Sequence, residues 1–230
     1  PSILNPVLYQ RVNVEGTTNV LEATRRAGVK RFIFGSSSSV YGERKAVPFS
    51  EADPVDHPVS PYAATKKAGE LLCHTYHHLF DMEIDCLRFF TVYGPRQRPE
   101  MAIYKFADAM LDGRTITMYG DGSSARDYTY ISDIIDGVIC ALHQPNGYRI
   151  MNLGGARVVT LSDLVITLGE ILECSPKLAY LPNQAGDVSI TSADVQRAQA
   201  AFGFAPKVSL PQGLERFAQW LKVIKHSPAD

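Results

Sequence analysis

The sequence has little of several features that mark specialised classes of protein. Its 230 residues include only four cysteines and one tryptophan, and the formal net charge is −1. No basic block argues for a nucleic-acid partner or an anionic membrane surface. No apolar run approaches the roughly 18 residues that a membrane span needs. With 45% hydrophobic residues, the chain is instead typical of a globular protein that buries a sizeable core.

The cysteines also lack the spacing of a metal site. Cys73, Cys86, Cys140 and Cys174 contain no Cys-x-x-Cys pair, so we interpret them as the reduced thiols of a cytoplasmic protein. Histidines stand at positions 74, 77 and 78, but no Cys or Asp/Glu ligand pattern completes a metal centre. We therefore expect an exposed helix face at these histidines, and no metal.

The most informative stretch runs from Ser36 to Lys66. The apolar run Arg31-Phe32-Ile33-Phe34 predicts a buried strand, and Ser-Ser-Ser-Ser-Val-Tyr-Gly follows at 36–42. Hydroxyl groups therefore gather at the carboxyl end of a strand, where open α/β sheets place ligands.

A helix is predicted to begin after this serine run. Ser60 is a suitable N-cap and Pro61 suits the first turn. Tyr62 and Lys66 are four residues apart, so they share one face of that helix. A lysine ammonium favours the phenolate over the phenol, and a phenolate beside a serine hydroxyl suits proton transfer with a substrate alcohol. Tyr-x-x-x-Lys alone is common, and a serine run is more often a turn, but the two in this order are more specific.

In this combination the sequence resembles the extended short-chain dehydrogenase/reductase family of NAD-dependent nucleotide-sugar epimerases and dehydratases. The resemblance implies catalytic roles for Ser37, Tyr62 and Lys66. It also implies that Asn13, with Tyr62 and Lys66, lies at the NAD cofactor, whereas the helical pattern alone would make Asn13 a surface residue. The implied reaction removes the proton of the C4 hydroxyl, passes hydride from C4 to NAD and returns it to the other face of a 4-keto sugar.

Three positions distinguish between reactions of this family. Dehydratases carry Asp-Glu after their catalytic Thr, and UDP-glucuronate decarboxylases carry an acidic residue before Val-Tyr-Gly; this chain has Ser38 and Ser39 there. UDP-galactose 4-epimerases have Asn at the position of Thr91. The segment 88–99 is similar to UDP-glucuronate 4-epimerases. The resemblance therefore implies C4 epimerisation of UDP-glucuronate to UDP-galacturonate, with Thr91 and Arg98 beside the carboxylate.

The resemblance implies further contacts to the nucleotide. Arg126 and Asp187 match family positions that hold the phosphates and ribose. Gln184 stands where many relatives have Arg, so one of the family's pyrophosphate contacts is in doubt for this chain. The implied substrate-binding residues are Ser38, Thr91, Arg98, Arg126 and Asp187. Two alternatives remain: another NAD-dependent nucleotide-sugar epimerase or dehydratase, or a truncated, non-catalytic sugar-nucleotide-binding fragment.

The expected fold class is α/β, as the C-terminal part of a Rossmann-type doubly wound parallel sheet with a smaller mixed α/β substrate-binding domain. We expect residues 1–97 and 127–155 to form the partial NAD-binding domain, and residues 98–126 and 156–230 the nucleotide-sugar-binding domain. The sequence has no Gly-x-x-Gly-x-x-Gly after a first strand, the feature that cradles a dinucleotide. The resemblance implies that the chain begins after the family's fourth strand, and this chain alone is expected to be inactive if it is truly truncated.

Periodicity and turn residues place the remaining elements. The predicted helices cover 7–27, 61–80, 102–111, 132–143, 160–172, 193–202 and 211–223, and the predicted strands 31–35, 83–90, 115–119, 148–153 and 177–181. Residues 120–128 are predicted to form a glycine- and serine-rich turn that ends near Arg126. Relatives dimerise through the helices that match 7–27 and 61–80, so the resemblance implies a homodimer.

Overall fold

A three-stranded parallel sheet forms the centre of the computed structural model, which describes residues 1–182 and 188–226. Its strands are β1 (Arg31–Ser37), β2 (Glu83–Phe89) and β6 (Tyr148–Leu153), in the order β1-β2-β6. The register places Ser36 opposite Arg88. β2 is buried along most of its length, as expected of a central parallel strand covered on both faces.

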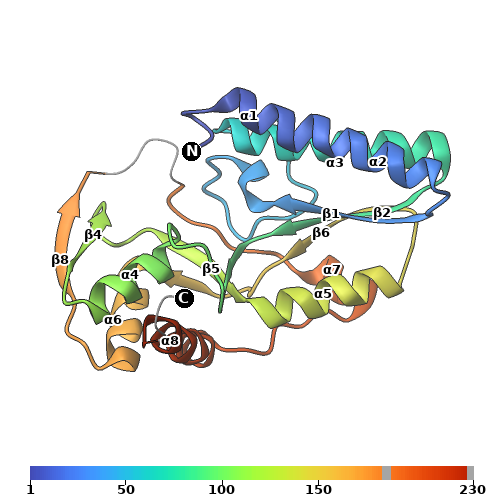
Figure 1. Ribbon diagram of the computed structural model, residues 1–230. Helices are drawn as coiled ribbons and strands as arrows, with labels where there is room; N and C mark the ends of the chain where they lie inside the picture. The colour runs from blue at the N-terminus through green and yellow to red at the C-terminus, as the bar shows by residue number, and fades with distance from the viewer. Residues whose placement is uncertain (183–187, 227–230) are drawn as a thin grey trace.

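Helices cover both faces of this sheet (Figure 1). On one face lie α1 (Pro6–Gln10), α2 (Gly16–Arg26) and α3 (Pro61–Phe80), and on the other lie α5 (Ile131–His143) and α7 (Gln196–Phe202). This three-layer arrangement with parallel strands confirms the predicted α/β fold class.

The remaining strands form two small sheets beside the central one. One has the order β3-β5-β7, from β3 (Thr91–Tyr93), β5 (Ala125–Tyr130) and β7 (Val158–Thr160), and the other pairs β4 (Thr115–Tyr119) with β8 (Lys177–Leu181) in parallel. Around them pack α4 (Ala102–Leu111), α6 (Leu161–Leu172) and α8 (Leu210–His226). The apolar side chains of these helices join those of β3, β4 and β5 in a core of their own. The division into two domains at the boundaries given above stays a prediction.

Some local details differ from expectation. The helix predicted to begin at Ser132 begins one residue earlier, at Ile131 after Tyr130. Arg126 lies within strand β5 rather than at the end of a turn, because residues 125–127 pair with β7. The helix predicted over 7–27 contains a π-helical turn at Arg11–Glu15, where one extra residue enters the helical path.

The boundaries of α3 follow from its end signals. Ser60 Oγ accepts a hydrogen bond from the Ala63 N–H at 3.2 Å, and Pro61 occupies the first helical position. At the other end Asp81 adopts a left-handed conformation with φ of 55°, a common helix stop. None of the helices in the described residues has the length and hydrophobicity that crossing a membrane requires.

Candidate active site

The end of β1 presents the hydroxyl groups that the sequence predicted there. Ser37 is the last residue of the strand and is buried. Its Oγ accepts the Ser39 N–H at 3.2 Å, which caps a short 3-10 turn over Ser38–Tyr41, and lies 3.1 Å from Ser39 Oγ. The strand end and the cap together fix the Ser37 hydroxyl in position.

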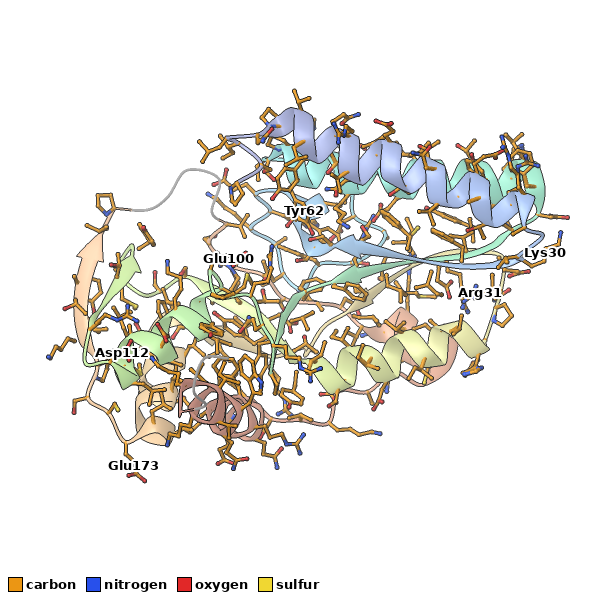
Figure 2. The ribbon with its side chains drawn as sticks, viewed as in Figure 1. Lys30, Arg31, Tyr62, Glu100, Asp112 and Glu173 are labelled. Atoms are coloured by element: carbon orange, nitrogen blue, oxygen red, sulfur yellow. The ribbon has the colours of Figure 1, made fainter. Side chains whose placement is uncertain are left out.

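The first two turns of α3 carry the predicted tyrosine and lysine. Lys66 Nζ lies 5.8 Å from the centre of the Tyr62 ring and donates to the Gly35 carbonyl oxygen at 2.8 Å. This contact fixes the lysine side chain to β1 at Gly35, two residues before the strand ends at Ser37. Burial lowers the pKa of Lys66. Figure 2 shows Tyr62 above the end of the sheet, on the same side of the molecule as Glu100.

The N-terminal helices also contact the first turn of α3. Asn13, in the π-helical turn, donates through Nδ2 to Thr65 Oγ1 at 2.9 Å. Tyr9 of α1 packs edge-on against Tyr62, with 6.1 Å between ring centres. Asn13 is therefore half-buried, and the structure brings it next to the Tyr62–Lys66 turn.

A cavity of about 200 Å³ is lined by residues close in sequence to Ser37 and Tyr62, among them Ser38 and Ser60. Three of the predicted substrate residues, Ser38, Thr91 and Arg126, line it. Its other described lining residues are Ser39, Gly42, Phe49, Val59, Ser60, Val188 and Thr191. The described lining residues include no carboxylate. They give the wall several hydroxyl groups and one guanidinium, that of Arg126.

A second cavity, of about 310 Å³, lies between β3, α4, β4 and β5. Thr91 and Arg126 line this cavity too, so the two cavities share a wall. Gln97, Glu100 and Lys105 contribute the other long polar side chains. Sequence reasoning did not select these three, although the polar run after β2 pointed to their neighbourhood.

Two predicted substrate-binding residues are not brought to these cavities, and Ser37, Tyr62 and Lys66 are not among the described lining residues either. Arg98 lines neither; its side chain is 72% exposed and pairs with Glu100 at 3.4 Å. Asp187 lies outside the described residues, as does Gln184. The roles assigned to Arg98 and Asp187 stay predictions.

Ser37, Tyr62 and Lys66 at the carboxyl end of a parallel sheet, with two polar cavities lined by nearby residues, form an arrangement that is suited to proton transfer with an alcohol group of a polar ligand. The model of the NAD dependent epimerase/dehydratase family matches residues 2–154. A UDP-glucuronate 4-epimerase of Thermodesulfobacterium geofontis is 41% identical over 222 residues, which are 96% of this chain and 68% of that relative.

Solved structures agree with this match. MoeE5 in complex with UDP-glucose and NAD superposes with a TM-score of 0.93 at 37% identity, covering 98% of this chain and 76% of that one. The UDP-glucuronic acid 4-epimerase of Bacillus cereus, in complex with UDP-glucuronic acid and NAD, gives 0.87 at 38% identity, with 92% and 68% covered.

The chain belongs to the NAD-dependent epimerase/dehydratase family. It is an NAD-dependent enzyme, and its reaction class is the epimerisation of nucleotide sugars. The predicted family and cofactor are thereby confirmed.

The residues present fit one end of NAD. Lys66 has three N–H donors and uses one on Gly35, so two are available within the described residues for ribose hydroxyls. Asn13 and Tyr62 border the same place. Within residues 1–182 and 188–226, β1 pairs only with β2, and no glycine-rich turn follows an earlier strand. The described residues therefore offer contacts to one end of NAD, a role that stays a prediction, and they contain no glycine-rich cradle for its pyrophosphate.

Proposed function

We propose that the protein interconverts UDP-glucuronate and UDP-galacturonate by inversion at C4. The observation that carries this proposal is the hydroxyl-rich cavity without a described carboxylate. Elimination of water and decarboxylation both call for a carboxylate acid or base at the positions of Ser38 and Ser39. A wall whose described residues include no acidic side chain also suits a sugar that carries its own negative charge, since like charges in a cavity repel.

In the proposed mechanism Tyr62, assisted by the Lys66 ammonium, takes the proton of the C4 hydroxyl. Ser37 donates a hydrogen bond to the same oxygen as it becomes a carbonyl. NAD, when bound, supplies the reversible acceptor for the hydride of C4. After the sugar turns over, the hydride would return to the opposite face of C4, and Tyr62 would give its proton back to the C4 oxygen.

The carboxylate of the substrate creates a hazard, because a 4-keto uronic acid is a β-keto acid and loses CO2 readily. The hydroxyls of Ser38, Ser39 and Thr91 line the smaller cavity and are suited to hold the carboxylate near the plane of the sugar. Arg98, proposed as a second contact, would have to leave Glu100 to reach it.

The larger cavity is proposed to hold the nucleotide. Its volume of about 310 Å³ falls within the usual range of ligand sites. Arg126 and Lys105 give its wall two cationic side chains, and guanidinium and ammonium groups are the usual partners of phosphates. The contact of Asp187 with the ribose belongs to the same proposal.

A second candidate is a 4-epimerase of a neutral UDP-hexose. The exposure of Arg98 favours it, because the guanidinium proposed for the carboxylate lies outside the cavity. The relative MoeE5 is described in complex with both UDP-glucose and UDP-glucuronic acid, so the two substrates differ little in what they require of the fold.

We also propose a homodimer, formed through the outer face of α1 to α3. Apolar side chains remain exposed there, among them Val7, Val12, Leu71 and Leu79.

The described cysteines are free thiols, which supports a cytoplasmic location.

The experiment is a product analysis with the complete native protein loaded with NAD. UDP-glucuronate and UDP-glucose are incubated separately, and the products are separated by chromatography while released CO2 is measured. UDP-galacturonate without CO2 supports the first candidate, and UDP-galactose alone supports the second. Release of CO2, or no turnover of either sugar, would overturn the proposal; a Tyr62→Phe variant controls for contaminating epimerase.

A further inference from the structure

A buried ion pair lies directly beneath the candidate active site. Glu70 of α3 and Arg88 of β2 are 0% and 1% exposed. Arg88 donates from Nε to Glu70 Oε1 at 2.8 Å and from Nη2 to Oε2 at 2.9 Å. Ser36 Oγ donates to the same Oε1 at 2.6 Å. The carboxylate therefore joins one helix and two strands at a single point.

This point is the last of three contacts between α3 and the end of β1. Gly69 lies so close to Phe34 that an added Cβ would be 2.2 Å from the ring. Lys66 reaches the Gly35 carbonyl, and Glu70 reaches the next residue along the strand. Three successive residues of the strand, Phe34, Gly35 and Ser36, are thus in contact with the helix that carries Tyr62.

The pair stays ionised although it is buried. Burial raises the pKa of Glu70, but the hydrogen bonds and the charge of Arg88 outweigh it, and the net pKa lies below the usual value. The Arg88 guanidinium also lies 4.8 Å from the centre of the Tyr41 ring. Buried ion pairs contribute little more to stability than well-packed apolar residues do, so the geometry that this pair imposes is the better reason for its presence.

We propose that Glu70 is a positioning residue of the reaction: held by Arg88, it binds Ser36 and thereby sets the distance between Ser37 on β1 and Tyr62 with Lys66 on α3. Ser36 is adjacent to the proposed catalytic serine, and Glu70 is one helical turn beyond Lys66 and two beyond Tyr62. The inference rests on the proposed function for the identity of the catalytic groups.

Two variants test the proposal, together with a matched control. Ser36→Ala removes only the hydroxyl that Glu70 binds, and Glu70→Gln removes the charge. Asp85→Asn is the control, because Asp85 is 0% exposed and belongs to the same strand as Arg88. Asp85 accepts two hydrogen bonds from Arg149, at 2.7 and 2.6 Å, and pairs with Arg31. This second ion pair lies at the opposite end of the sheet, where Figure 2 labels Arg31.

All variants are made in the complete protein loaded with NAD. We expect Ser36→Ala and Glu70→Gln to lower kcat about 10- to 100-fold, since small displacements of reacting groups have effects of this size, with KM within twofold. Hydrogen–deuterium exchange of residues 61–66 should become faster in both. Asp85→Asn should lower the melting temperature without either change.

Wild-type kcat and wild-type exchange in Ser36→Ala would overturn the proposal, even if Glu70→Gln fails to fold. An equal fall of kcat in Asp85→Asn would also overturn it, because any damage to the sheet would then be enough to lower kcat. The exchange measurement needs no substrate. If the wild-type protein turns over neither UDP-sugar, the proposed function fails while exchange still decides whether Glu70 holds the first turn of α3.

Discussion

Tyr62 and Lys66 lie on one face of α3, with the lysine Nζ 5.8 Å from the centre of the tyrosine ring. The lysine is held to the Gly35 carbonyl of β1, so the pair is fixed against the strand that ends at Ser37. This relationship gives the proposed mechanism its acid–base group.

Replacing Tyr62 by Phe removes the proposed proton acceptor and keeps the ring. We expect the epimerisation rate to fall by about 10²- to 10⁴-fold, the usual contribution of a general acid or base, with little change in thermal stability. Tyr9→Phe is the matched control, because Tyr9 packs against Tyr62 at 6.1 Å and its variant keeps that contact. Steady-state kinetics of both variants test this expectation. Equal losses of epimerisation rate in the two variants would argue against the assigned role of Tyr62.

A negative charge placed in the smaller cavity should discriminate between the two candidate substrates. Ser38→Asp puts a carboxylate on a wall without a described one, and repulsion should raise KM for UDP-glucuronate about tenfold or more. Ser38→Asn has similar volume without the charge and should change KM far less. For UDP-glucose the two variants should behave alike; a larger effect of Asp on the neutral sugar would contradict the explanation.

The low pKa of Glu70 predicts a specific dependence of stability on pH. Because its folded-state pKa lies below the ordinary value of 4.5, Glu70 contributes stability that is present above pH 4.5 and lost as the pH falls through the folded-state pKa. In Glu70→Gln this contribution is absent. The slope of unfolding free energy against pH should therefore be shallower, by up to about 1.4 kcal/mol per pH unit, in urea titrations below pH 4.5. Parallel slopes for the variant and wild type would show that Glu70 does not titrate in this way.

Close packing of α3 on β1 should make two glycines respond oppositely to alanine. Gly69→Ala would place Cβ 2.2 Å from the Phe34 ring and should destabilise the protein by about 1–3 kcal/mol. At Gly16 of α2 the nearest atom to an added Cβ is 3.9 Å away, so Gly16→Ala should stabilise by about 0.5–1 kcal/mol. Urea unfolding measures both, and a stable Gly69→Ala variant would refute the close approach.

The proposed dimer face can be tested with one charge. Leu71 of α3 is 59% exposed, and Leu71→Glu should convert a dimer of the complete protein into a monomer in light scattering. Ile166 of α6, which is 57% exposed, provides the control, since Ile166→Glu lies outside the proposed face. A monomeric wild-type protein, or a dimer in Leu71→Glu, would exclude this interface.

Sequence reasoning located the elements with strong local signals. The helix from Pro61 to Phe80 and the strands over 115–119, 148–153 and 177–181 were placed at their observed bounds. Their ends carry capping residues, prolines and glycines, whose conformational preferences act within a few residues.

Features that depend on tertiary contacts were missed or misplaced. The short strand over 158–160 exists because residues 125–127 offer it a partner, and its sequence alone carries no such information. Gln97 and Lys105 reach the larger cavity only because α4 packs beside β4 and β5. Arg98, one residue from Gln97, points instead to solvent, a difference that the order of residues in a loop does not encode.

The wall shared by the two cavities has a consequence for how this enzyme could change during evolution. Thr91 and Arg126 border both the small and the large cavity, so under the proposed assignment a mutation there that admits a different sugar would also alter the contacts to the nucleotide. Ser38 and Ser39 border the small cavity alone. New sugar preferences should therefore arise first at the serines, where adaptation carries no penalty in nucleotide affinity, and the residues of the common wall should be the slowest to diverge.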